Sequence, residues 1–201
     1  MRGNGTLYLL LALGAMLTLT ACGTSEQPVN MEKLLAQPKT FVGSETCKNC
    51  HLEHYDSWKG TNHSRMAQDV AANADAFIVD IDVERIKADF MKLEEAGKLQ
   101  KPVSEIYFPN KEDILYTLGN EWKQRYIVKK DDVLFISPIQ YNVETDRWVN
   151  YHEADWDQRP WLLKCGGCHT TGTDLEAGTF TEPGVGCEGC HGAGSWHTAL
   201  P

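Results

Sequence analysis

The sequence predicts a mainly α-helical domain with a small antiparallel β insert. Ser44 is a suitable N-cap for a helix through Trp58, and Asn110 for a shorter helix that ends at Gly119. Between them, residues 82–96 carry apolar side chains at helical spacing up to a terminating glycine. From residue 123 the pattern becomes β-like, in the stretches 124–129, 133–140 and 147–151. We therefore expect one domain over residues 41–201, with the insert at about 123–151.

The first 21 residues have the proportions of a signal peptide. Arg2 is their only charged residue, and the apolar run over residues 7–19 is too short to span a membrane. Small residues then precede Cys22, a pattern that resembles the lipobox of bacterial lipoproteins, in which the cysteine is lipidated. Gly23 follows, and glycine at this position points to the outer membrane, facing the periplasm or the cell surface. The alternative is an ordinary signal peptide with an incidental cysteine.

Residues 22–40 are polar and contain two prolines, which is typical of a tether. The whole sequence has 19 basic and 28 acidic residues, a formal net charge of −9. Such a surface repels nucleic acid and anionic lipid, and it favours basic docking partners. We therefore expect no nucleic-acid partner, and membrane contact only through the lipid anchor.

The motif Cys-x-x-Cys-His occurs three times, at residues 47–51, 165–169 and 187–191. With 7 cysteines and 7 histidines among 201 residues, chance predicts about 0.01 copies. Six of the seven cysteines fill these three motifs, and Cys22 is the seventh. The repetition therefore indicates one chemical purpose that is served three times.

Cys-x-x-Cys-His is the attachment signature of c-type haem. The two thiols lie one helical turn apart and add to the two vinyl groups of a haem, and the adjacent histidine binds its iron. We therefore expect three c-type haems and a compact core dominated by porphyrin. The thiols that attach them are Cys47, Cys50, Cys165, Cys168, Cys187 and Cys190, and the proximal iron ligands are His51, His169 and His191.

Two other uses of these cysteines remain open. The last two pairs are separated by eighteen residues, which also fits a four-thiolate zinc site. Disulfides within the pairs would suit an oxidising compartment. Neither alternative accounts for the histidine that follows each pair.

Four histidines remain as candidates for the opposite side of each haem, namely His54, His63, His152 and His197. His54 follows His51 by three residues on the same predicted helix, and so it faces the same way. Because it cannot readily cross the plane of its own haem, we expect His54 to lie on the surface or beside the site.

The other three are better placed to reach an iron. His63 follows a glycine and is free to turn inward. His197 lies too close in sequence to His191 to pass around that haem, and it should therefore reach a neighbouring one. His152 ends the insert and arrives from a separate segment. We expect His63, His197 and His152 to be the distal ligands.

These motifs and their surroundings resemble the multihaem c-type cytochromes. The resemblance lies in residues Phe41–His51, Tyr55–His63, Tyr116–Gly119, Gln124–Tyr126 and Cys187–His197. More narrowly, they look like the family that includes the tetrahaem electron acceptor of bacterial hydroxylamine oxidoreductase. In that family, histidines at the positions of His63 and His197 are distal iron ligands. This chain departs from the namesake in having three motifs rather than four.

Two imidazoles on one iron leave no open position, and such a haem cycles between Fe(III) and Fe(II) without binding substrate. We therefore expect an electron-transfer lipoprotein, rather than an enzyme, which relays electrons between redox proteins such as other cytochromes outside the cytoplasm. One alternative is an enzyme with a five-coordinate haem that acts on a small nitrogen or sulfur oxyanion. A second is a subunit of an extracellular multihaem assembly, as a homo- or hetero-oligomer.

The lipid anchor gives a direct test. Cys22→Ser removes the thiol that would be acylated, and so the protein should lose its lipid mass and its retention by membranes. Membrane fractionation and intact mass measure both. Unchanged mass and retention in the variant would contradict lipidation at Cys22.

Overall fold

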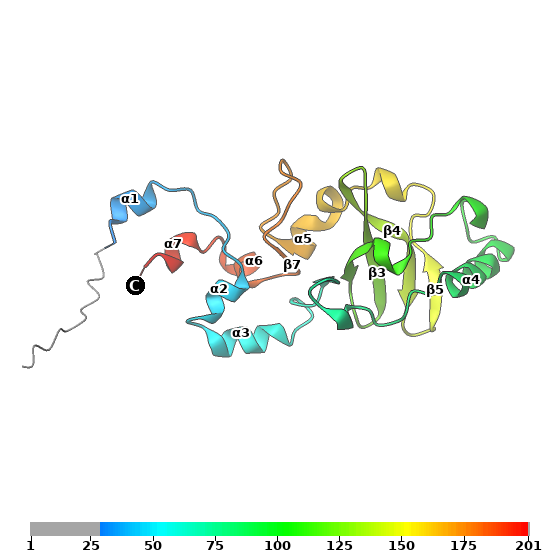
Figure 1. The fold of residues 1–201 in the computed structure, drawn as a ribbon, viewed down its shortest axis with the longest axis horizontal. Helices are drawn as coiled ribbons and strands as arrows, with labels where there is room; N and C mark the ends of the chain where they lie inside the picture. The colour runs from blue at the N-terminus through cyan, green and yellow to red at the C-terminus, as the bar shows by residue number, and fades with distance from the viewer. Residues whose placement is uncertain (1–28, 201) are drawn as a thin grey trace, which may run out of the picture.

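The computed structural model describes residues 29–200. The predicted signal peptide, residues 1–21, and the predicted lipidation site, Cys22, lie outside the described residues. The segments around the first and third motifs lie together at one end of the molecule, and a β-sheet lies at the other (Figure 1). Between residues 29 and 200, no helix is long and apolar enough to cross a membrane.

The largest element is a five-stranded antiparallel sheet in which each strand pairs with the next one along the chain. Its strands are β1 Ala67–Asp69, β2 Ile114–Leu118, β3 Lys123–Lys130, β4 Val133–Asn142 and β5 Arg147–Asn150. The prediction of a mainly α-helical domain is therefore wrong. The chain mixes helices with a sheet that begins far before the predicted insert.

The segment after Asn110 explains much of this difference. Asn110 begins only a 3-10 turn, Lys111–Asp113, and the helix predicted up to Gly119 is instead strand β2. Its β-branched and aromatic residues favour a strand, and pairing with β1 and β3 on its two sides secures it. The cap is visible in the sequence, but the two pairing partners are not.

The three strands that the β-like pattern predicts are present as β3, β4 and β5. The first hairpin turns at Asp131 and Asp132, whose φ angles are 49° and 63°. This left-handed conformation matches the twist of a two-residue hairpin. The second turn includes Asp146, whose carboxylate accepts hydrogen bonds of 2.6 Å from both Arg85 and Tyr141.

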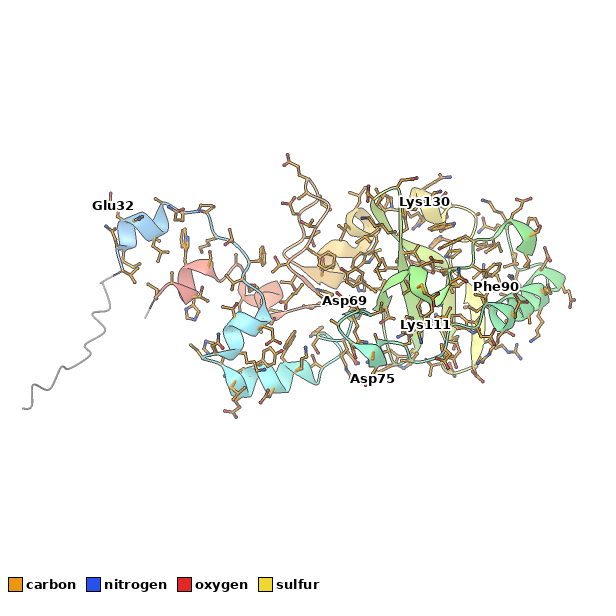
Figure 2. The ribbon with its side chains drawn as sticks, viewed as in Figure 1. Glu32, Asp69, Asp75, Phe90, Lys111 and Lys130 are labelled. Carbon is orange, nitrogen blue, oxygen red and sulfur yellow. The ribbon has the colours of Figure 1, made fainter. Side chains whose placement is uncertain are left out.

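Helix α4, Val83–Glu95, confirms the predicted amphipathic helix. The Asp82 carboxylate accepts hydrogen bonds from backbone N–H groups of its first turn and caps it. Ile86 and Phe90 are fully buried and pack in one core with Trp148 of the sheet (Figure 2). The helix thus closes the sheet end of the molecule.

The single helix predicted over residues 44–58 is in fact two short helices, α2 Ser44–Lys48 and α3 Leu52–Lys59. The chain bends between them at His51, where φ is −121° and ψ is 44°. Ser44 does not cap a helix with its side chain. Its hydroxyl donates to Glu182 at 2.7 Å instead, a partner that the local sequence does not indicate.

The remaining elements are short. They are α1 Met31–Leu35, the 3-10 turns Ala74–Ala76, Val103–Glu105 and Trp156–Gln158, the π-helical turn Leu162–Gly166, α5 Gly167–His169, β6 Thr170–Thr171, β7 Glu182–Pro183, α6 Cys187–His191 and α7 Ser195–Thr198. Strands β6 and β7 pair as a small antiparallel ladder. They bring the third motif back beside the first.

Buried apolar side chains are distributed very unevenly. Of the buried hydrophobic residues in the described part of the chain, all except Tyr55 lie between Ala67 and Trp161. The sheet end therefore has a conventional side-chain core, and the end that carries the first and third motifs has almost none.

Phe90 tests the core of the sheet end. Phe90→Ala removes a fully buried ring and should lower the free energy of unfolding by about 3–5 kcal/mol. Denaturant unfolding followed by far-UV circular dichroism measures this loss. Met91→Ala, at an exposed neighbouring position on α4, is the control and should change stability little. Equal losses in the two variants would contradict the described packing.

Candidate functional site

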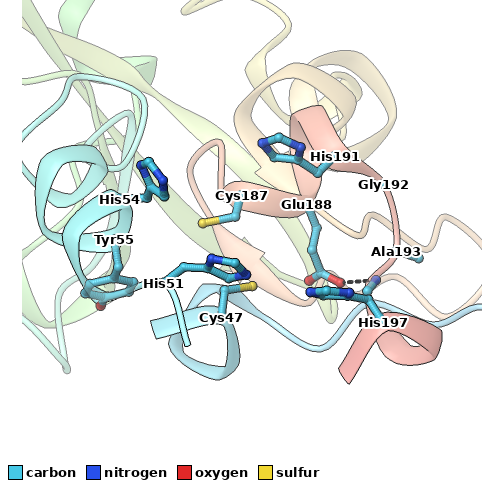
Figure 3. A pocket seen from close by; sticks show the side chains of 11 residues that line it. Cys47, His51, His54, Tyr55, Cys187, Glu188, His191, Gly192, Ala193 and His197 are labelled. Atoms are coloured by element: carbon cyan, nitrogen blue, oxygen red, sulfur yellow. Dashed lines mark hydrogen bonds between the residues drawn. The ribbon is translucent and has the colours of Figure 1, made fainter. Parts of the chain in front are cut away.

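A cavity of about 480 Å³ separates the first and third motifs, and its size falls within the range of cofactor sites. Helices α2 and α3 supply one side, and α6 with α7 and the loop between them supply the other (Figure 3). Its lining residues are Cys47, His51, His54, Tyr55, Cys187, Glu188, His191, Gly192, Ala193, Gly194 and His197. The fold thus joins two motifs that lie 140 residues apart, from position 47 to position 187.

The cavity brings the imidazoles of His51 and His197 close together. The ring centroids of His51 and His197 are 6.0 Å apart, with planes 22° from parallel. A metal–imidazole bond is about 2 Å long, as in zinc sites, so two rings on opposite sides of one metal have centroids roughly 6 Å apart. The separation of His51 and His197 matches the spacing of two imidazoles on one metal, and the centroid separation of His51 and His54, 6.4 Å, is close to the same value.

The thiols of the first and third motifs also meet at this cavity. Cys47 and Cys187 both line the cavity. Burial raises the pKa of the Cys47 thiol, and the nearby Cys187 and Glu188 raise it further. In all three motifs the first cysteine is partly buried and the second is exposed. Each motif thus presents one thiol at the surface and one further inside.

The second motif forms a separate site against the sheet end. Burial lowers the pKa of His169, and the positive charge of Arg125 lowers it further. The ring is therefore neutral at pH 7, and neutral imidazole is the form that binds a metal. Its Nδ1 is buried and has no hydrogen-bond partner among the described residues.

His152 lies near this second motif. It lines a small cavity of about 20 Å³ together with Cys165 and Trp156. Its backbone is left-handed, with φ 51°, a conformation uncommon for residues other than glycine. Its Nδ1 lies 3.8 Å from the Asp155 carboxylate. The structure thus brings His152 toward the attachment residues of the second motif and not toward the larger cavity.

His63 and His54 lie in different surroundings. The His63 side chain is exposed and does not line the larger cavity, although its carbonyl accepts a hydrogen bond of 2.9 Å from Val185 N–H. His54 lies in the cavity wall, with its ring centroid 6.4 Å from that of His51. In the sequence, His54 lies beside the first motif only. Because the cavity is shared, His54 can face the third motif instead.

Two alternatives for the cysteines receive no support from the arrangement. Among residues 29–200, no three or more His, Cys, Asp or Glu side chains are grouped so as to hold a metal ion. The last two cysteine pairs therefore do not form a four-thiolate zinc site. The six motif cysteines are also not joined in disulfides.

Comparison with known proteins identifies the group. A family model described as cytochrome c554 and c-prime matches residues 46–97 and 140–192, slightly more than half of the chain. The chain belongs to this family. It is a multihaem c-type cytochrome, an electron-transfer protein whose cofactor is c-type haem. The unmatched stretch, residues 98–139, contains β2, β3 and most of β4.

One solved structure has a similar fold, and a second is a weaker match. The crystal structure of the outer cell wall cytochrome OcwA is 26% identical with a TM-score of 0.59, over 79% of this chain and 32% of that one. An undecahaem cytochrome from the S-layer of Carboxydothermus ferrireducens is 22% identical with a TM-score of 0.49, over 82% of this chain and 22% of that one. The chain thus spans a third or less of either protein. No curated protein matches it, and the narrower resemblance to the acceptor of hydroxylamine oxidoreductase is not confirmed.

His197 is the most direct test of the cavity. His197→Ala removes one of two imidazoles spaced for a single iron, and so one haem should become high-spin and bind carbon monoxide. Absorption spectra of the reduced protein, with and without carbon monoxide, measure the change. A variant that stays entirely low-spin would contradict the assignment of His197.

Proposed function

We propose that this cytochrome is an exported electron-transfer lipoprotein that carries three c-type haems and relays electrons between redox partners. The observation that carries the proposal is the shared cavity, which holds two attachment motifs and two further histidines, His54 and His197. A site built only to bind one haem would not need both motifs at one cavity. Two centres in contact suit the passage of electrons from one to the other.

Bound haem supplies one-electron chemistry, and the residues of this chain anchor it, bind its iron and limit its access to water. Cys47 and Cys50, Cys165 and Cys168, and Cys187 and Cys190 are the attachment pairs, followed by the proximal ligands His51, His169 and His191. The half-buried first thiol of each pair would fix the macrocycle from inside, while the exposed second thiol remains accessible for attachment.

We assign the distal ligands from position. His197 would serve the iron of His51, because their ring centroids lie 6.0 Å apart. His152 would serve the iron of His169, because it lines a small cavity together with Cys165. For the iron of His191 there are two candidates. The resemblance to multihaem cytochromes favours His63, and the cavity wall favours His54. With these ligands every iron would be held by two imidazoles, an arrangement that would suit a carrier rather than an enzyme.

The proposed location and partners rest on the sequence and on the similar structures. We propose residues 1–21 as the signal peptide, 22–40 as the tether from an acylated Cys22, and 41–201 as the trihaem domain. The similar structures are described as cytochromes of the outer cell wall and of the S-layer, which agrees with an exported protein. Other cytochromes are the natural redox partners, and the net charge of −9 favours basic docking surfaces.

Haem content and spin state test this proposal together. The mass of the acid- and solvent-extracted protein should exceed that of the processed chain by three haems, and the spectrum should be low-spin throughout and unaffected by carbon monoxide. These results are expected because each iron has two imidazoles. A mass without covalent haem would refute the cofactor. One high-spin haem in the wild type would favour an enzyme.

Three single variants assign the remaining ligands in the same assay. His152→Ala should convert one haem to a high-spin, carbon monoxide-binding centre and leave the other two unchanged. His54→Ala and His63→Ala are then compared. The variant that produces one high-spin, carbon monoxide-binding haem identifies the ligand of the His191 iron, and the other variant serves as its control. If His152→Ala leaves the spectrum unchanged, His152 is not a ligand.

A further inference from the structure

Glu188 is a buried carboxylate that the proposed mechanism does not use. It occupies the first variable position of the third motif, and only 3% of its surface is exposed. Both of its oxygens accept hydrogen bonds from Val42 N–H at 3.0 Å, and Gly43 and Gly194 N–H donate at 2.7 Å each. Three backbone donors match an ionised carboxylate, which can only accept.

No cation neutralises this charge nearby. Among the described residues Glu188 forms no ion pair with a lysine, arginine or histidine within 4.0 Å. The residues that line the cavity include no lysine and no arginine. Peptide dipoles stabilise the carboxylate where it lies, but they do not cancel its net charge.

The chain is shaped to hold Glu188 at this position. Gly192, with φ 79°, ends α6 and turns the loop so that the N–H of Gly194 reaches the carboxylate. A Cβ at Gly194 would lie 3.1 Å from the Glu188 carboxylate, so a larger residue would press on it. In Figure 3 the carboxylate lies in the wall of the cavity that His51 and His197 also line.

We propose that the Glu188 carboxylate lowers the reduction potentials of the two haems that share this cavity. This rests on the proposed attachment of haem to the first and third motifs. Reduction adds one electron to Fe(III) and makes the centre less positive. A fixed negative charge in a dry site stabilises the ferric form relative to the ferrous form, and the potential falls. Glu188 is a positioning and charge-setting residue, not a catalytic one.

The test is a potentiometric titration of the holoprotein with three one-electron components. Glu188→Gln keeps the size of the side chain and removes its charge. Two of the three components should move to higher potential, each by about 59 mV. This shift corresponds to a tenfold change in the ferric–ferrous equilibrium constant. The third, the haem of His169, lies outside the cavity and serves as an internal reference, so it should move least.

Two further variants separate charge from position. Glu188→Asp keeps the charge but shortens the side chain, and it should leave the potentials close to those of the wild type. Glu53→Gln removes an exposed charge two residues after His51, and it should shift the potentials much less than Glu188→Gln. If Glu188→Asp shifts the potentials as much as Glu188→Gln, the role is structural and the inference is wrong.

Haem content is measured first, so that the two proposals can fail separately. A wild-type protein without covalent haem refutes the proposed function. Fully loaded Glu188→Gln with unchanged potentials, or with all three shifted equally, refutes only the inference. If Glu188→Gln fails to take up haem, the potentials of Glu182→Gln are measured in its place. It removes a second charge near Cys187 while its amide can still bond Ser44, and its potentials should rise in the same pair.

Discussion

The candidate site depends on the contact between residues 40–44 and the segment from residue 182 to residue 195. Thr40 and Ser195 bond through two reciprocal hydrogen bonds, of 2.9 and 3.2 Å. Glu188 and Glu182 then bind the backbone of residues 42–44, and the Ser44 hydroxyl accepts from the N–H of Cys187 at 3.0 Å. These are backbone and carboxylate contacts, which fix geometry more tightly than apolar packing does. Without them the first and third motifs would not share a cavity.

The sheet supports this contact from a distance. The chain leaves the first motif through α3, passes through the sheet end and returns through the second motif. Trp161 is fully buried in a core with Ile127 and Leu118, and Cys165 packs against the same cluster. Trp58 adds a bond from its indole N–H to the Val185 carbonyl, at 2.8 Å. The sheet therefore fixes where the second motif lies, and Trp58 of α3 helps to fix how the chain approaches the third motif.

The sequence predicted those features that have a local cause. The amphipathic pattern before Gly97 found α4, and the β-like pattern found β3 to β5 with their turns. The sequence could not predict β2, whose neighbours lie on distant segments, and the predicted helix after Asn110 was wrong for that reason.

The residues of the three motifs were evident from the sequence, but the cavity that the first and third motifs share was not. His54 was judged against its own haem alone, and Glu188 carried no signal because its partners are backbone groups of residues 42, 43 and 194.

The buried apolar side chains are divided unevenly between the two ends of the molecule. The sheet end buries almost all of the apolar residues, so it can fold around its own side chains. Within residues 29–200, the end with the first and third motifs buries Tyr55 alone among hydrophobic residues, together with polar groups such as Ser44, Thr171 and Glu188. A unit with so little apolar burial is marginal by itself. Binding of a cofactor contributes directly to the folding of such a unit. Under the proposed function, haem attachment would therefore complete this end, with the carboxylate contacts setting the register and the macrocycles supplying the missing core.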